Sequence, residues 1–223
     1  MKVRAAMNTK PIRLPLGPTG FARVTGVSRE TLERLQTYVG LLEQWNRRIN
    51  LVGRNTMGDV WRRHILDSAQ LLPLLPARTR VLVDLGSGAG LPGLVLAIMG
   101  VPEVHLVESD QRKAAFLREA MRVTGTPAIL HVARAEKLAG IAADVVTARA
   151  LASMSELLDL AANVMGARSL GFFLKGETAA EELEAARAEW DFAAELIPSR
   201  AEPAASIVKL QGLRRRASIR AVS

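Results

Sequence analysis

Apolar residues recur along this chain with two different periods, and the period changes near residue 80. Before that point the spacing is three or four residues, which is typical of one face of an amphipathic helix. The first such stripe comprises Leu32, Leu35, Val39, Leu42, Trp45 and Ile49. Ser28 precedes the stripe and can cap its helix. A second helix is predicted from about Gly58 to Leu75.

After residue 80, short apolar runs rich in β-branched residues alternate with longer helical runs. Such alternation predicts an α/β fold, in which a mostly parallel seven-stranded sheet carries helices on both faces. The end of the basic segment LRRRASIRAVS, which closes the chain, is a further strand candidate. The predicted strands cover residues 81–84, 104–108, 127–132, 143–147, 169–174, 192–197 and 206–210, and the predicted helices include 112–123, 153–164 and 178–189.

These patterns divide the chain into three parts. Residues 1–27 hold three prolines and no period, so a loose N-terminal arm is predicted there. Residues 28–76 are a predicted N-terminal helical extension, and residues 77–223 are the predicted α/β domain. The uncharged stretch 85–102 contains five glycines and two prolines, which favours a protein core over a membrane span.

The stretch Val81–Gly93, VLVDLGSGAGLPG, links the first strand to a helix through a glycine-rich turn. Glycine permits positive φ at such a turn, and it lets a ligand approach the backbone without a Cβ in between. Pro92 falls in the first turn of the helix, where a missing N–H costs nothing. The pattern is typical of the first turn of a nucleotide-binding sheet.

Two templates fit these glycines and imply different cofactors. Gly88, Gly90 and Gly93 match G-x-G-x-x-G, the fingerprint that receives a dinucleotide pyrophosphate. Asp84 and Gly86, taken with Gly88 and Gly90, match D-x-G-x-G-x-G, which resembles the first motif of class I S-adenosylmethionine (SAM) methyltransferases. The second template is favoured because it requires an acidic residue at the position that Asp84 occupies.

The second predicted strand, VHLVE, ends in Glu108. Both templates need a carboxylate at this place for the ribose hydroxyls of the ligand. Glu108 therefore indicates a nucleoside ligand without choosing between the two cofactors.

Composition adds a preference for a polyanionic partner. The net charge is +8, and 49% of the 223 residues are hydrophobic, which fits a globular protein with a sizeable core. The chain has no cysteine, which excludes disulfides, thiolate metal sites and cysteine nucleophiles. The N-terminus has no apolar run of signal-peptide length, so a cytoplasmic protein without a membrane segment is expected. No bound metal is expected either.

Arginine supplies most of the positive charge and occurs in clusters, which favours nucleic acid as the partner. A solvated surface is the alternative for any one cluster, because it is the usual location of arginine. The clusters are Arg47, Arg48 and Arg54; Arg62 and Arg63; Arg112 and Lys113; and Arg214, Arg215 and Arg216.

The second predicted helix carries His64 and Asp67, which share one helical face. A Ser/His/Asp hydrolase is excluded, because Ser68 would need a sharp exposed turn and an oxyanion site. Two interpretations stay open: the pair fastens this helix to the sheet, or His64 takes part in the site.

In an open α/β sheet, ligands gather at the carboxyl ends of the strands. An N-P-P-Y-like motif, used for exocyclic amines, is missing after the fourth predicted strand, where the chain reads TARA. Methylation at pyrimidine C5 needs a cysteine, which this chain lacks. N7 of guanine is already nucleophilic and loses no proton before attack, so positioning can supply much of the rate. Arg149 and Lys175 follow the fourth and fifth predicted strands and are candidates for that positioning.

The chain resembles the RsmG (GidB) family of bacterial small-subunit ribosomal RNA methyltransferases. The resemblance covers about residues 28–178 and rests on WNRRINLVGR, RHILDS, DLGSGAGLPG, ESDQRKAAFLRE, RAE, TARALAS and FLKGE, in this order. It implies SAM-dependent methylation of N7 of one guanosine in the decoding-region hairpin of 16S rRNA. Naked rRNA, an assembly intermediate and the finished 30S subunit all stay open as the form of the substrate.

The resemblance also implies site residues. It places cofactor contacts on Gly86, Leu91, Ala135, Glu136 and Arg149, to which the fold argument adds Gly88 and Glu108. Lys175 lies in a family motif and is expected to face the RNA. The full set of candidates for RNA contact is Arg63, His64, Lys175, Arg214, Arg215 and Arg216.

Other functions remain open at this point. A methyltransferase for another RNA would share the glycine loop and the basic charge. A methyltransferase for a protein or a small molecule would share the loop but leaves the net charge of +8 unexplained. A nicotinamide-dependent reductase fits only the G-x-G-x-x-G match. A non-enzymatic RNA-binding protein would neither bind nor consume SAM.

Overall fold

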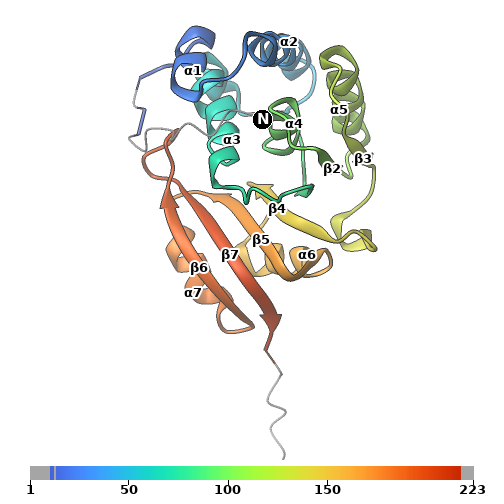
Figure 1. Ribbon diagram of the computed structural model, residues 1–223, viewed down its shortest axis with the longest axis vertical. Helices are drawn as coiled ribbons and strands as arrows, with labels where there is room; N and C mark the ends of the chain where they lie inside the picture. Colours follow the sequence, from blue (N-terminus) through green and yellow to red (C-terminus); the bar gives the residue numbers. More distant parts are fainter. Residues whose placement is uncertain (1–10, 13, 217–223) are drawn as a thin grey trace, which may run out of the picture.

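The computed structural model describes residues 11, 12 and 14–216 of the chain (Figure 1). Seven strands form one sheet in the order β3-β2-β1-β4-β5-β7-β6. β1 to β5 pair in parallel, whereas β7 is antiparallel to both β5 and β6. The predicted seven-stranded, mostly parallel α/β sheet is therefore confirmed. The strands are β1 (Val81–Leu85), β2 (Glu103–Val107), β3 (Ile129–His131), β4 (Ala143–Arg149), β5 (Met165–Lys175), β6 (Trp190–Pro198) and β7 (Ser206–Arg215).

Helices cover both faces of the sheet (Figure 1). Alternation along each strand explains the two faces: Phe172 of β5 belongs to one buried cluster and its neighbour Phe173 to the other. The first cluster includes side chains of α1, α2, α4 and α5, and the second includes those of α6 and α7. The regular helices are α1 (Pro18–Thr25), α2 (Arg29–Asn46), α3 (Asp67–Ala69), α4 (Gly93–Ile98), α5 (Gln111–Thr124), α6 (Met154–Ala162) and α7 (Ala179–Ala186).

The predicted loose arm is wrong for residues 18–25, which form α1. Pro18 stands at the start of this helix, and Gly26 ends it with a positive φ of 69°. Phe21 is fully buried, and its ring centroid lies 5.4 Å from that of Trp61. A helix of eight residues is too short to show a period, and burial of Phe21 stabilises it. Residues 1–10 and 13 of the arm lie outside the described residues.

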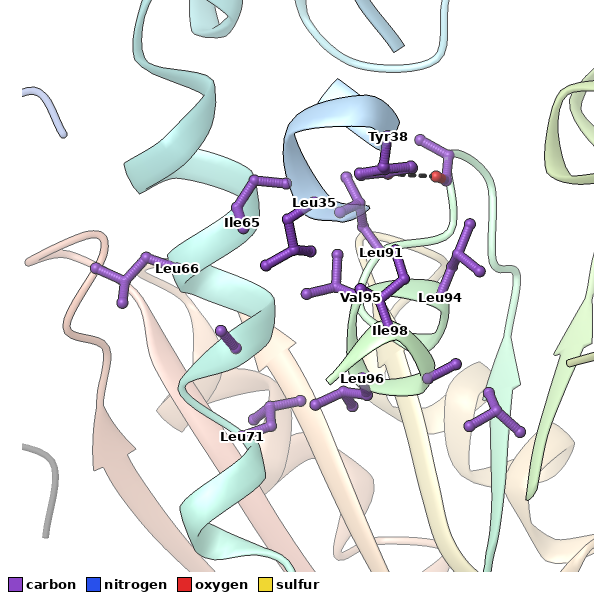
Figure 2. Close-up of a cluster of buried hydrophobic side chains, with 14 of the residues drawn as sticks. Leu35, Tyr38, Ile65, Leu66, Leu71, Leu91, Leu94, Val95, Leu96 and Ile98 are labelled. Atoms are coloured by element: carbon purple, nitrogen blue, oxygen red, sulfur yellow. Dashed lines mark hydrogen bonds between the residues drawn. The ribbon is translucent and has the colours of Figure 1, made fainter. Parts of the chain in front are cut away.

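The second predicted helix is irregular. A 3₁₀ segment η1 (Arg54–Asp59) precedes a π-type segment η2 (Trp61–Leu66), which continues into α3 and a 3₁₀ turn η3 (Leu72–Leu74). Trp61, Ile65 and Leu66 of this segment belong to the buried core cluster. Figure 2 shows Ile65 beside Leu35 of α2. One continuous cluster thus joins the N-terminal helices to the sheet.

The basic segment after residue 210 belongs partly to β7, which extends to Arg215. The strand predicted over 206–210 is therefore longer than expected. The strand candidate at the end of the chain falls on residues 217–223, outside the described residues. Among the residues described, no helix is long and apolar enough to cross a membrane.

Parallel pairing gives the sheet two distinct edges. The carboxyl ends of β1, β2, β4 and β5 meet at one, which we call the C-terminal edge. The starts of these strands meet at the other, the N-terminal edge. Because β7 runs antiparallel to β5, its last residues lie at the N-terminal edge, and Ser206 at its start pairs with Lys175 at the C-terminal edge.

Candidate functional site

The glycine-rich turn lies at the C-terminal edge, between β1 and α4. Gly86, Gly88 and Gly90 all have positive φ, at 65°, 55° and 86°. At Gly90 a Cβ would lie 2.7 Å from the Cβ of Leu94, so the turn packs too closely on α4 for any other residue. The helix begins at Gly93, with Pro92 at its N-cap. The conformation predicted for the turn is therefore present.

Glu108 follows β2 and faces this turn. Its Oε2 accepts from the Gly88 amide at 2.8 Å, and its Oε1 accepts from the Asp110 amide at 2.7 Å. A carboxylate has about four lone-pair positions, so both oxygens retain acceptor capacity. The structure thus brings Glu108 and Gly88 together, as the ribose-binding prediction requires.

Asp84 lies beneath the turn and is fully buried. The Thr147 hydroxyl donates to its Oδ1 at 2.7 Å, whereas Oδ2 has no hydrogen-bond partner among the described residues. Burial raises the pKa of Asp84 to about 6, against the opposing effect of the hydrogen bond from Thr147. Asp84 therefore holds a buried carboxyl group with an unused oxygen directly under the loop.

Tyr38 supports the same turn from α2, a role that the apolar stripe does not predict. Its hydroxyl donates to the Ala89 carbonyl at 2.6 Å (Figure 2). Burial raises the pKa of Tyr38, so the phenol stays a donor. Tyr38 is three residues after Leu35 of the apolar stripe, and this spacing is the sequence signal that it faces the core.

Leu91 was predicted to contact a cofactor, but its side chain is buried in the core between α2 and α4 (Figure 2). Only its backbone is left to face a ligand at the turn. Ala135 and Glu136 lie in a 3₁₀ turn after β3, η4 (Ala135–Lys137), where Ala135 is half-buried and Glu136 is exposed. Their cofactor role stays a prediction.

Arg149 ends β4 and is held by the second N-terminal helical segment. Its Nη2 donates to His64 Nδ1 at 2.7 Å, and its Nη1 lies 3.4 Å from Asp67 Oδ2. The other ring nitrogen of His64, Nε2, lies 2.7 Å from the Thr56 hydroxyl, which in turn donates to the Gly53 carbonyl at 2.6 Å. This series of contacts fixes the Arg149 guanidinium at the C-terminal edge.

His64 is neutral in this arrangement. Burial lowers its pKa to about 3, and the positive charges of Arg149 and Arg63 add to the effect. Neutral imidazole has one acceptor, which faces Arg149, and one N–H, which can donate to Thr56. His64 is only 3% exposed, so as placed it is covered from RNA, contrary to expectation. Its contacts agree with the interpretation that it fastens the helix to the sheet.

The loop after β4 covers part of the glycine turn. Ala150 has a positive φ of 48°, and Leu151 lies on Gly86, where a Cβ would be 2.3 Å from Leu151 Cδ1. Lys175 holds this loop, since its ammonium donates to the Ala152 carbonyl at 2.8 Å and lies 2.5 Å from Glu182. The expectation that Lys175 faces RNA is wrong for this structure, because its side chain is only 9% exposed and bound internally.

The other arginines predicted to contact RNA have different surroundings. Arg63 is ion-paired with Glu202. Arg215 is ion-paired with Asp159 and Glu189 and lies over the Trp190 ring, and Arg216 is ion-paired with Asp191. The side chain of Arg214 makes no hydrogen bond or ion pair with a described residue. The three consecutive arginines therefore do not act as one charged unit, because alternation along β7 separates them.

No group of three or more His, Cys, Asp or Glu side chains within residues 11, 12 and 14–216 is arranged to hold a metal ion. The site consists of a glycine turn with two acids, a restrained arginine and a covering loop. This arrangement suits a ligand with a nucleoside part, and it offers positioning groups at the place where a second substrate would meet that ligand.

Comparison with known proteins identifies the family. A family model described as "GidB: rRNA small subunit methyltransferase G" matches residues 31–205. A ribosomal RNA small subunit methyltransferase G of Rhodospirillum centenum is 59% identical over 192 residues, covering 86% of this chain and 89% of that protein. The corresponding protein of Rhodospirillum rubrum is 54% identical, covering 89% and 98%.

The fold has relatives among solved structures. An rRNA methylase from Streptococcus thermophilus superposes with a TM-score of 0.51 at 13% identity, covering 65% of this chain and 93% of that one. Identity this low supports the fold alone. The family match and the two relatives cover most of the chain, including the glycine turn and the residues around Arg149. The chain therefore belongs to the GidB family, the rRNA small subunit methyltransferases G.

Proposed function

We propose that this protein transfers a methyl group from SAM to N7 of a guanosine in the decoding-region hairpin of 16S rRNA. Family membership supports methylation of small-subunit rRNA. The observation that carries the proposal is the glycine turn at the C-terminal edge, with Glu108 bonded to the Gly88 amide and Asp84 buried beneath it.

The residues present fit SAM. The turn exposes backbone without a Cβ, Glu108 retains acceptor positions for ribose hydroxyls, and Asp84 Oδ2 is buried without a partner. Gly86, Gly88, Leu91 through its backbone, Glu108, Ala135, Glu136 and Arg149 would hold the cofactor. SAM supplies an activated methyl group on a sulfonium sulfur.

The described edge suits a nucleophile that needs no deprotonation. His64 is the nearest candidate base to Arg149, but its acceptor nitrogen already faces that guanidinium. In attack by guanine N7, the lone pair forms the new N–CH₃ bond while the C–S bond breaks, and no proton leaves. The protein then has to align the two reactants and exclude water. Intramolecular reactions show that such alignment lowers the activation free energy by several kcal/mol.

Arg149 and Lys175 act in this proposal as positioning residues. Arg149 is restrained by His64 and by the nearby Asp67, so its guanidinium presents a fixed direction at the end of β4. Lys175 acts through the loop, because it binds the Ala152 carbonyl next to Leu151. Arginine commonly binds guanine through O6 and N7; here N7 must remain free, so O6 or a phosphate is the available acceptor.

The test is transfer of labelled methyl from SAM to purified ribosomal particles and RNAs from cells that lack the modification. We expect label in the 16S rRNA of 30S subunits and none in 50S subunits or transfer RNA. Label in another RNA with an unlabelled 30S would contradict the proposed substrate and leave the cofactor assignment standing. Failure to bind SAM by calorimetry would contradict both.

A further inference from the structure

A groove crosses the N-terminal edge of the sheet, at the opposite ends of the strands from the glycine turn. Two adjoining hollows of about 530 and 510 Å³ share Arg78, Ala167, Arg168 and Ser169 in their walls. The first continues to Arg214 near the end of β7. We call the whole depression the N-edge groove.

The N-edge groove carries three exposed arginines. Arg78, Arg168 and Arg214 are exposed, and none of their guanidinium groups makes a hydrogen bond or ion pair with a described residue. They come from three places in the sequence: the segment before β1, the start of β5 and the end of β7. The fold thus brings these three arginines together, although they lie far apart in the sequence.

The two acids that line the groove are already engaged. Asp144 accepts from the backbone amides of Arg80 and Val81 at 2.8 and 3.0 Å. These two hydrogen bonds and the nearby guanidiniums, including Arg78, keep the pKa of Asp144 low. Asp191 is bound to Arg216 at 2.8 Å. Their charges reduce the local field, but neither acid pairs with Arg168 or Arg214.

The spacing suits a nucleic acid backbone. β1 and β7 are separated in the sheet by β4 and β5, which is three strand intervals or roughly 15 Å. One RNA strand offers more than one phosphate over that length, because every nucleotide carries a backbone phosphate charge. β4 is seven residues long, so the groove lies roughly 20 Å from Arg149.

We infer that the N-edge groove is a second RNA-binding site, in which Arg78, Arg168 and Arg214 contact phosphates of a segment outside the methylated hairpin. This inference rests on the proposed function, because it takes small-subunit rRNA as the polyanion. A protein that binds RNA at both edges of its sheet recognises a folded particle or a long RNA better than an isolated hairpin.

The test compares two triple variants that each remove three positive charges. The groove variant is Arg78→Gln, Arg168→Gln and Arg214→Gln. The control variant is Arg29→Gln, Arg122→Gln and Lys209→Gln, three cations that are ion-paired with Glu33, Glu119 and Glu195. Thermal unfolding of both variants checks that each is folded.

Binding to 16S rRNA and to a synthetic decoding-region hairpin is measured against salt concentration. For 16S rRNA, we expect the log–log slope of the groove variant to fall in magnitude by about 2 to 3, as for three lost phosphate contacts. For the hairpin, we expect the parental slope. Equal slopes for parent and groove variant on 16S rRNA, or an equal fall in the control variant, would overturn the inference.

The two proposals can fail separately. If the parent labels 30S subunits but the groove variant shows a parental slope, only the second site is contradicted. If the parent transfers no label while the groove variant loses slope, the proposed function is contradicted and the groove remains an RNA site. Methyl transfer to the hairpin by the groove variant should match the parent, because none of its three residues lies at the C-terminal edge.

Discussion

The two edges of the sheet treat charged and polar side chains in opposite ways. At the C-terminal edge, Asp84, His64 and Lys175 are buried or nearly so, and each is bound to partners from distant elements. At the N-terminal edge, Arg168 and Arg214 are exposed and make no ion pair with a described residue. The first edge holds its polar side chains in fixed contacts, and the second presents exposed positive charge.

This contrast has a consequence for the energetics of substitutions at the two edges. A buried polar group that loses its partner costs about 1–3 kcal/mol, whereas an exposed one costs little. Substitutions at the C-terminal edge should therefore change stability and ligand binding together. Substitutions of the exposed, unpaired arginines Arg168 and Arg214 at the N-terminal edge should change association with a polyanion and leave stability nearly unchanged.

The largest effect is expected for Gly90→Ala. The residue must keep a positive φ, and its Cβ would meet Leu94 at 2.7 Å, so strain and overpacking together cost about 2–5 kcal/mol. Denaturant unfolding and SAM calorimetry should both show the loss. Gly100→Ala is the control, since it also has positive φ but open space around its Cβ. Equal losses in the two variants would mean that strain alone, without the tight packing of the turn, explains the effect.

Asp84→Asn should change how stability depends on pH. The folded pKa of about 6 lies above the ordinary value of 3.8, so the folded state holds the proton more tightly. Protonated Asp84 thus stabilises the folded state at low pH. This contribution to the free energy of unfolding is on the order of 3 kcal/mol, and it is lost as the pH rises from about 4 through 6.

The variant cannot titrate at this position, so its stability relative to the parent should rise across that pH range and then level off. Urea unfolding at pH 4, 5, 6 and 8 measures the difference. A constant difference between parent and Asp84→Asn would show that the buried carboxyl is not protonated in the folded state.

Glu108→Ala should weaken SAM binding by about 1.5–3 kcal/mol, because charge-assisted hydrogen bonds to the ribose are lost. Calorimetry measures the affinity. Glu103→Ala, at the start of the same strand and half-exposed, is the matched control and should bind SAM normally. Unchanged affinity in Glu108→Ala would remove this residue from the cofactor site.

His64→Ala should destabilise the protein by about 1–3 kcal/mol, since Arg149 Nη2 loses its acceptor. With the histidine pKa at about 3, activity between pH 5 and 8 should show no histidine titration. His64→Gln restores an acceptor and should recover part of the stability. A stable but inactive His64→Ala would instead place His64 in the chemistry.

The smallest effects concern β7. Arg214→Ala should leave stability within about 0.5 kcal/mol of the parent, because the residue is exposed and unpaired among the described residues. Arg215→Ala should cost slightly more, since it removes two ion pairs and a contact with the Trp190 ring. Thermal unfolding measures the two variants side by side, and equal stabilities would show that the ion pairs of Arg215 contribute nothing in solution.

The glycine turn, Asp84 and Glu108 could be predicted because their roles depend on local spacing and on strand order. The seven-stranded sheet followed from the alternation of strands and helices. The partners of Arg149 could not be predicted in this way, because His64 is 85 positions away and its helix is irregular. Tyr38 was missed for the same reason, as its acceptor lies 51 positions away.

The incorrect expectations have one common cause. The sequence predicts that Lys175 and Arg215 contact RNA, but the fold supplies Glu182 to the first and Asp159 to the second. It predicts a loose arm where α1 forms, because α1 depends on a tertiary contact, the burial of Phe21 against Trp61. A charge or a short segment has no fixed role until its neighbours in space are known.

The proposed chemistry is tested most directly by the atom that carries the new methyl group. After incubation of unmodified 30S subunits with this protein and labelled SAM, mass spectrometry of the digested 16S rRNA identifies the modified nucleoside and its position. A single 7-methylguanosine in the decoding-region hairpin is the predicted result. Methyl on an exocyclic amine or a ribose oxygen would contradict it, because those acceptors must lose a proton and the proposed chemistry assigns no residue to take it.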